Sequence, residues 1–217
     1  MTDFLVIIVC GIYVVAEAAA AYCFYKFFKW RSESVRKFVH IMTANLMFPI
    51  TYVSVSFWGR VFGPILFIVL NAIASYSGMG KFLGMTDKKR HIGLVIYPFS
   101  VLVLTLLNIY GVISAGAAVA GVFIMGWGDG FAALVGTKFG KHKYTVFGKY
   151  HKSVEGTLTM AFMSTLAVLL FQPQVPFWGA LVAGVFASLL ENVSPSGIDN
   201  LTVPILSALV VEVLCIL

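Results

Sequence analysis

One stretch decides the organisation of this chain: Gly126-Trp-Gly-Asp-Gly-Phe-Ala-Ala-Leu-Val-Gly-Thr-Lys-Phe-Gly140. Nearly all of its residues are small or apolar, as in a segment that lies beside lipid. A charged side chain is costly in that environment, and one that is retained there usually has a chemical role. The stretch therefore predicts a membrane protein that carries a functional group at Asp129.

The composition of the whole chain agrees with this reading. Of its 217 residues, 60% are hydrophobic and 11% are charged, and the mean hydropathy is +0.95. These values exclude an ordinary soluble globular protein. Apolar runs that approach the roughly 20 residues needed to cross a bilayer lie near residues 4–25, 41–57, 61–78, 92–109, 112–127, 154–171, 176–190 and 201–217. They predict an all-α polytopic bundle of about eight transmembrane helices, with seven or nine as alternatives, that forms a single domain over residues 1–217.

The basic residues are distributed unevenly between the loops. Fourteen of the fifteen follow the first, third or fifth apolar run, and only Arg60 lies in an even-numbered loop. Basic loops usually stay on the cytoplasmic side of a membrane. We therefore expect both termini to be non-cytoplasmic and the net charge of +6 to form a cytoplasmic field. Such a face suits anionic headgroups or a nucleoside triphosphate, and we expect no nucleic-acid partner; in part the basic residues serve only to set topology.

The glycines around Asp129 have two interpretations. Gly126 with Gly130, and Gly136 with Gly140, form small-xxx-small pairs that are typical of close helix packing in membranes. Glycines also allow the backbone to approach phosphate closely, and a carboxylate between them suits a divalent cation. Asp129 as a simple helix cap is the alternative.

Two further segments bring charge to the same predicted face. Lys149-Tyr-His-Lys-Ser-Val-Glu-Gly156 opens the next helix, so that Lys152 lies at the positive end of the helix dipole and Glu155 lies in the first turn. Glu155 there either interacts with the dipole alone or acts with Lys152 on a nucleotide. The segment from Glu191 to Asn200 joins the last two runs and adds Asp199, which, like Asn200, is a candidate cap for the final helix.

A third basic group precedes the second apolar run. Spacing of three and four along a helix places Lys37 and Arg36 on the same face as His40. Free backbone N–H groups at the starts of helices favour anions. The inner boundary of the bundle is therefore a candidate phosphate site. Glu17 and Glu212 fall near the middle of the first and last runs, where an interhelical hydrogen bond and a substrate contact are both open interpretations.

Four blocks of the sequence together resemble the polyprenol kinase family, which includes phytol, farnesol and dolichol kinases and the CTP-dependent diacylglycerol kinase. The blocks are Arg36-Lys-Phe-Val-His40, Gly128-Asp-Gly-Phe-Ala-Ala-Leu-Val-Gly-Thr-Lys-Phe-Gly-Lys-His142, Lys152-Ser-Val-Glu-Gly156, and Glu191 with Asp199-Asn200. The likeness extends over about residues 36–204. A more distant similarity connects the family with CDP-diacylglycerol synthases.

The resemblance implies an integral membrane enzyme whose active site faces the cytoplasm. It would transfer the γ-phosphate of a nucleoside triphosphate, usually CTP, to the hydroxyl of a membrane lipid alcohol with the help of Mg²⁺. The residues implied in nucleotide binding are Arg36, Lys37, Gly128, Gly130, Gly136, Lys149, Lys152, Ser153 and Asn200. Those implied as metal ligands are Asp129, Glu191 and Asp199, and those implied in catalysis are Asp129, Glu155 and His40.

Two alternative functions stay open at this point. A CTP:phosphatidate cytidylyltransferase also uses CTP and a membrane lipid, but the segment Ser194–Asp199 is much reduced from the signature expected of that enzyme. A transporter would explain the intramembrane Glu17 and Glu212. Against it, the sequence shows no inverted repeat. The sequence also lacks a P-loop, which argues against an ordinary ATPase.

Overall fold

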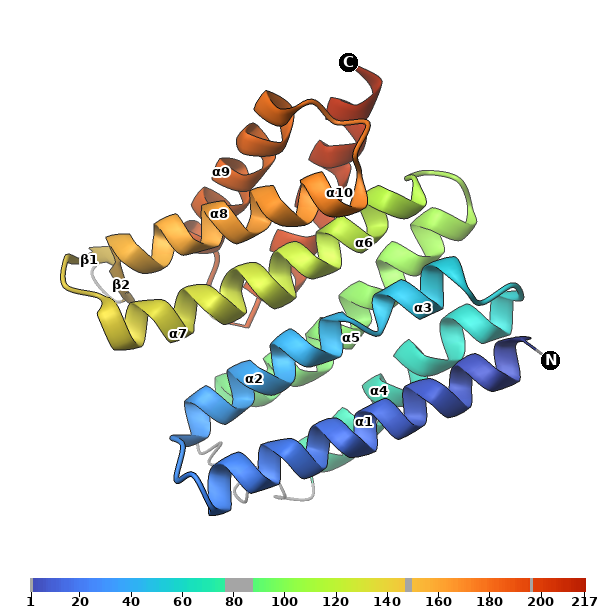
Figure 1. The fold of residues 1–217 in the computed structure, drawn as a ribbon, viewed down its shortest axis with the longest axis horizontal. Helices are drawn as coiled ribbons and strands as arrows, with labels where there is room; N and C mark the ends of the chain where they lie inside the picture. The colour runs from blue at the N-terminus through green and yellow to red at the C-terminus, as the bar shows by residue number, and fades with distance from the viewer. Residues whose placement is uncertain (1, 77–87, 147–149, 196) are drawn as a thin grey trace.

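The computed structural model describes the chain except for residues 1, 77–87, 147–149 and 196 (Figure 1). The described residues are mostly helical. The helices are α1 (Thr2–Lys26), α2 (Ser32–Ala44), α3 (Met47–Tyr52), α4 (Phe57–Tyr76), α5 (Lys88–Ile109), α6 (Ala115–Phe123), the π-helix η2 (Ile124–Asp129), α7 (Gly130–Phe139), α8 (Val154–Phe171), α9 (Phe177–Val193) and α10 (Asp199–Ile216). Two short strands, β1 (Lys143–Val146) and β2 (Tyr150–Ser153), pair as an antiparallel hairpin.

The expected all-α membrane architecture is confirmed, apart from the hairpin. Within the described residues, five helices are long and apolar enough to cross a bilayer, and two shorter apolar helices, Gly93–Ile109 and Phe177–Val193, accompany them. A helical segment lies at each of the apolar runs predicted from the sequence. The number of spans and their orientation stay predictions.

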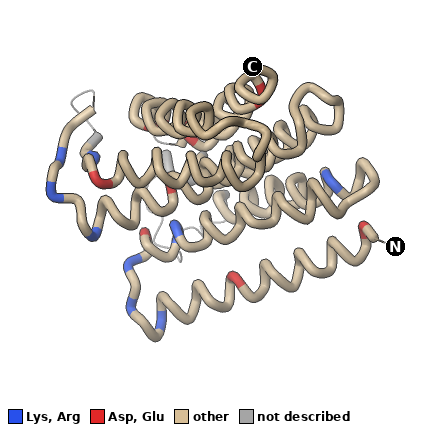
Figure 2. Tube along the Cα trace, turned by 45° about the horizontal axis from the view of Figure 1, so that its top comes forward, with Lys and Arg blue, Asp and Glu red and all other residues tan. Residues whose placement is uncertain are grey.

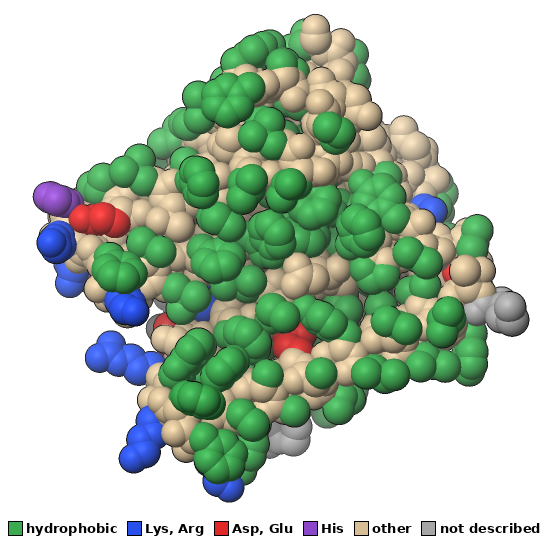
Figure 3. All heavy atoms as spheres, viewed as in Figure 1, with side chains coloured by type: hydrophobic (Ala, Val, Ile, Leu, Met, Phe, Trp, Pro, Cys, Tyr) green, Lys and Arg blue, Asp and Glu red, His purple; other side chains and the backbone are tan. Residues whose placement is uncertain are grey.

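The bundle buries small side chains and exposes large ones. Helix α6 lies at the centre, where Ala117, Ala118 and Ala120 have no exposed surface. Large apolar side chains such as Phe4 and Val15 of α1 point outward, and Figure 3 shows hydrophobic side chains over most of the visible face. This arrangement suits a lipid environment, in which helices associate through close packing of small residues because burying apolar surface brings little gain.

Three local features differ from the expectation. The run near 41–57 is not one helix, because α2 ends at Ala44 and α3 begins at Met47. The run that was expected to end near residue 127 continues to Phe139, since η2 joins α6 to α7 in one helical span of 25 residues. The hairpin was not predicted. Its first strand, β1, alternates between exposed and half-buried residues, a pattern that the many charges in this segment obscured.

Most of the Lys and Arg residues lie at one end of the bundle, as the blue segments of the trace in Figure 2 show. This end is formed by the end of α1, the start of α2, the end of α7 and the hairpin, and both chain termini lie away from it. Arg60 lies near the start of α4, which is not one of the elements that form this end. The clustering expected from the loop pattern is therefore present in three dimensions, and we call this end of the molecule the basic end.

Candidate functional site

The centre of the site is a buried ion pair between α2 and η2. The Lys37 Nζ donates to Asp129 Oδ2 over 2.5 Å, and the two side chains are only 9% and 11% exposed. Removing two charges from water is costly unless they are paired. The pair therefore fixes the start of α2 against the helix that carries Asp129.

His40 follows Lys37 by one helical turn and faces the same carboxylate. Its Nε2 lies 3.8 Å from Asp129 Oδ2 and has no hydrogen-bond partner in the described structure. The ring also contacts Tyr97 of α5, with ring centroids 4.3 Å apart. Sequence reasoning missed Tyr97, because a tyrosine in an apolar run looks like an ordinary core residue.

Glycines allow the helix that carries Asp129 to approach its neighbours. A Cβ atom at Gly126 would clash with Ala44 of α2, and one at Gly130 would clash with Ile41 of the same helix. A Cβ at Gly128 would lie 2.6 Å from the Met160 Sδ of α8. These contacts support the packing interpretation of the glycines. A π-helical turn, which is rare and often found at functional sites, presents Asp129 between the two neighbouring helices.

A second ion pair lies where the hairpin meets α8. The Lys152 Nζ donates to Glu191 Oε1 over 2.5 Å and to the Glu191 carbonyl over 2.9 Å. Ser153, the next residue, caps α8 by accepting a hydrogen bond from the Gly156 N–H. A Cβ atom at Gly136 would lie 2.9 Å from the Ser153 Oγ, so this glycine packs against the cap. The pair fixes β2 to the end of α9.

Glu155 lies in the first turn of α8, as predicted, and its carboxylate contacts the loop before the hairpin. It accepts hydrogen bonds from the backbone N–H groups of Lys141 and His142 at 3.1 and 3.2 Å, and it lies 2.8 Å from the His142 Nδ1. These contacts anchor the loop. A catalytic role for Glu155 stays a prediction.

Asp199 and Asn200 begin α10 and do not cap it, so the capping prediction was wrong. The cap position is Ile198, without a side-chain hydrogen bond. The Asp199 Oδ1 instead accepts from the N–H groups of Gly197 and Asn200, at 2.8 and 2.9 Å. The Asn200 Nδ2 donates to the Gly93 carbonyl over 3.1 Å. Asn200 therefore connects α10 to α5.

These elements bring charges of both signs close together. Asp129 lies near enough to Glu191 and to Asp199 for the carboxylates to repel one another, and Arg36, which bonds Glu33 at 2.5 Å, attracts both Asp129 and Asp199. Of the predicted residues, Lys149 lies outside the described part of the chain. Figure 3 shows the acidic and basic side chains of the visible face mainly at the basic end, where the molecular outline is indented.

The carboxylates do not form a ready metal cluster. In the part of the chain that the structure describes, no three His, Cys, Asp or Glu side chains are close enough together to hold a metal ion. Mg²⁺, however, is usually bound by one or two carboxylates together with substrate phosphates and water. Asp129 with Glu191 or Asp199 fits such a shared site, and this ligand set stays a prediction.

The two intramembrane glutamates take part in interhelical hydrogen bonds. Glu17 accepts from the Thr43 Oγ1 at 2.7 Å, which joins α1 to α2. Glu212 accepts from the N–H and hydroxyl of Ser114 at 2.8 and 2.6 Å, which joins α10 to the start of α6. These contacts support the structural interpretation of both residues.

Comparison with known proteins identifies three relatives. The chain is 36% identical over 190 residues to phytol kinase from Synechocystis sp., which covers 82% of this chain and 78% of the relative. It is 29% identical over 190 residues to a dolichol kinase from Schizosaccharomyces pombe and 26% identical over 195 residues to one from Arabidopsis thaliana. It spans 37% and 33% of these two longer proteins. No family model matches the chain, and no solved structure matches it significantly.

Proposed function

Because this chain belongs to the polyprenol kinase family, we propose that it phosphorylates the hydroxyl of a membrane lipid alcohol. The donor is a nucleoside triphosphate, CTP in our proposal, and the acceptor is an isoprenoid alcohol such as phytol, farnesol or a polyprenol, or else diacylglycerol. The observation that carries the proposal is the buried Lys37–Asp129 pair, in which a cation for phosphate and a carboxylate for metal lie together.

The cationic residues bind the nucleotide phosphates in this proposal. Phosphoryl transfer requires mainly positioning and charge neutralisation. Arg36 and Lys37 come from the start of α2 and Lys152 comes from β2, so they approach a triphosphate from two sides. Lys37 and Lys152 each hold a carboxylate at 2.5 Å. On nucleotide binding, each ammonium exchanges part of this contact for phosphate oxygens.

When the lysine ammonium groups turn to the phosphates, the carboxylates are free, and they would then hold the cation. Asp129, with Glu191 or Asp199, would hold Mg²⁺, and the bound ion would neutralise charge on the phosphate oxygens. His40, whose Nε2 lies 3.8 Å from Asp129 Oδ2, is then free to accept the proton of the alcohol or to orient its hydroxyl. The alcohol enters sideways from the bilayer, so its polar group meets the nucleotide at the basic end.

The proposal includes a topology. Eight helical segments cross the membrane, α2 and α3 together forming one of them, and the basic end faces the cytoplasm. The clustering of Lys and Arg at that end (Figure 2) and the usual retention of basic loops in the cytoplasm support this orientation.

A transfer assay tests the function directly. The purified protein in detergent is incubated with Mg²⁺ and CTP, ATP, GTP or UTP labelled at the γ-phosphate, together with phytol, farnesol, a polyprenol, dolichol or diacylglycerol. We expect the label in the lipid product, with CTP as the best donor. Release of pyrophosphate with a cytidylyl group on the lipid would instead identify a cytidylyltransferase. Absence of any labelled lipid over the whole panel would contradict the proposal.

A further inference from the structure

Two buried polar atoms for which the described residues provide no hydrogen-bond partner belong to neighbouring rings close to η2. One is the Tyr97 hydroxyl, on a residue that is only 7% exposed, and the other is the His40 Nε2. Their rings are in contact, with centroids 4.3 Å apart. A buried polar group without a partner destabilises the folded state. Two such groups side by side therefore require a reason.

The surrounding polar side chains show that the helices here can satisfy such groups. The Tyr13 hydroxyl donates to the Met42 carbonyl at 2.9 Å and accepts from Asn45 at 3.0 Å. Asn45 in turn accepts from the Trp127 Nε1 at 3.3 Å. Tyr13 and Tyr97 thus offer a direct contrast, because both lie in the bundle and only the hydroxyl of Tyr13 is used in protein contacts.

The Tyr97 hydroxyl lies beside η2, one helical turn before Asp129. A Cβ atom at Gly126 would lie 3.1 Å from the Tyr97 hydroxyl, which places this hydroxyl beside η2, three residues before Asp129. Helix α2 begins at the basic end (Figure 1), so Lys37 lies nearer that end and His40 one turn deeper. Phosphates at Lys37 and a hydroxyl at Tyr97 would therefore approach Asp129 from opposite sides.

We infer that Tyr97 and His40 bind the hydroxyl group of the lipid alcohol. An alcohol has one donor and two acceptor sites, so a single group satisfies both unpartnered atoms. The Tyr97 O–H donates to the alcohol oxygen, and the alcohol O–H donates to the His40 Nε2 when the ring proton is on Nδ1. The inference rests on the proposed function for the identity of the ligand, and it adds that Tyr97 selects a hydroxyl over an apolar chain end.

Binding measurements with two matched ligands test the inference without relying on turnover. The affinities of phytol and of the hydrocarbon that lacks its hydroxyl are compared on the wild type, on Tyr97→Phe and on the control Tyr13→Phe. One net hydrogen bond corresponds to roughly 2–12-fold in affinity. We expect the wild type and Tyr13→Phe to prefer the alcohol by about tenfold, and Tyr97→Phe to lose most of that preference while its affinity for the nucleotide is unchanged.

Thermal unfolding without lipid alcohol provides a second readout. Removing an unsatisfied buried hydroxyl should leave the unfolding temperature of Tyr97→Phe unchanged or raised, whereas Tyr13→Phe should lower it because two hydrogen bonds are lost. An equal alcohol preference in wild type and Tyr97→Phe, or a large loss of stability in Tyr97→Phe, would overturn the inference. If the alcohol preference depends on Tyr97 but no phosphate is transferred, the inference stands and the kinase proposal fails.

Discussion

Lys37 and Asp129 are 92 residues apart in the sequence and form a 2.5 Å ion pair between α2 and η2. A buried ion pair is a poor stabilising device, because well-packed apolar residues of similar volume often do as well or better. Its presence inside a bundle of apolar helices is better explained by a chemical role. Four substitutions, one in the pair and three in the residues around it, test this interpretation.

Asp129→Asn keeps the shape of the side chain and removes its charge. We expect kcat to fall at least about 100-fold, as for the loss of a group that stabilises transition-state charge. Asp3→Asn is the matched control, since Asp3 accepts backbone hydrogen bonds from Val55 and Ser56 at the opposite end of α1 from the basic end. Steady-state kinetics on both variants make the comparison. Near-normal turnover in Asp129→Asn would remove Asp129 from the mechanism.

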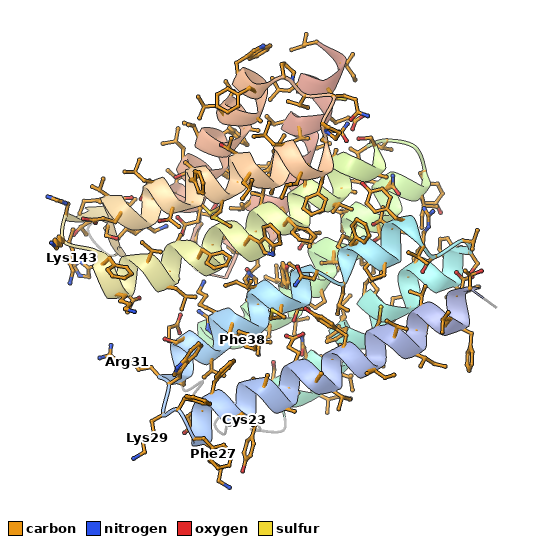
Figure 4. All side chains as sticks on the ribbon, in the orientation of Figure 1. Cys23, Phe27, Lys29, Arg31, Phe38 and Lys143 are labelled. Carbon is orange, nitrogen blue, oxygen red and sulfur yellow. The ribbon has the colours of Figure 1, made fainter. Side chains whose placement is uncertain are left out.

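Lys152→Ala should weaken nucleotide binding. Loss of a charged phosphate contact is expected to raise the KM for the nucleotide about tenfold, with a smaller effect on the KM for the alcohol. The exposed Lys143 of the same hairpin, labelled in Figure 4, provides the control, and Lys143→Ala should change both constants less than about twofold. Equal effects of the two substitutions would indicate only a general electrostatic attraction.

Glu155→Gln should have a milder effect than Asp129→Asn. The amide oxygen can still accept from the Lys141 and His142 N–H groups, so we expect the loop to keep its place and kcat to fall less than about tenfold. Limited proteolysis of the hairpin, with Glu155→Ala as the disruptive variant, reports on the loop itself. A loss of kcat as large as that of Asp129→Asn, with the hairpin still protected, would give Glu155 a direct part in catalysis.

Gly130→Ala tests the packing role of the glycines. The added Cβ would clash with Ile41 of α2, and overpacking of this kind typically costs about 1–3 kcal/mol. Gly11→Ala in α1 is the control, because nothing lies within 4 Å of its added Cβ and alanine favours helix. Thermal unfolding in detergent should show a lower midpoint for Gly130→Ala only. An unchanged midpoint with weakened nucleotide binding would favour a direct contact with phosphate.

The helices could be predicted from the sequence because they depend on local hydropathy. The points at which helices are interrupted or change their winding could not be predicted from hydropathy. Hydropathy falls at Gly126–Asp129, so the run was expected to end there, yet contacts with α2 and α8 allow the helix to continue through η2. The gap at Asn45 and Leu46 between α2 and α3 also interrupts an apolar run. Both features depend on neighbouring helices, which a local pattern does not contain.

The site could be predicted in its residue types and only partly in its contacts. Carboxylates and cations in the loops of one side indicated a common location, and Asp129 does lie near enough to Glu191 and Asp199 for their charges to repel. Which cation binds which carboxylate was not predictable, because Lys152 reaches Glu191 across 39 residues. Tyr97 gave no signal, since only the three-dimensional structure reveals a hydroxyl without a partner.

The π-helical turn at Ile124–Asp129 has a consequence for the angular phase of everything that follows it. An ordinary α-helix advances by about 100° per residue, and the wider π turn shifts α7 relative to the phase that α6 would impose. If one residue were deleted from η2, the helical span from α6 to α7 would stay continuous, but Asp129 would rotate away from Lys37. The direction in which this carboxylate points is therefore set by the π-helical turn. A sequence of the same hydropathy that is one residue shorter in η2 would not reproduce it.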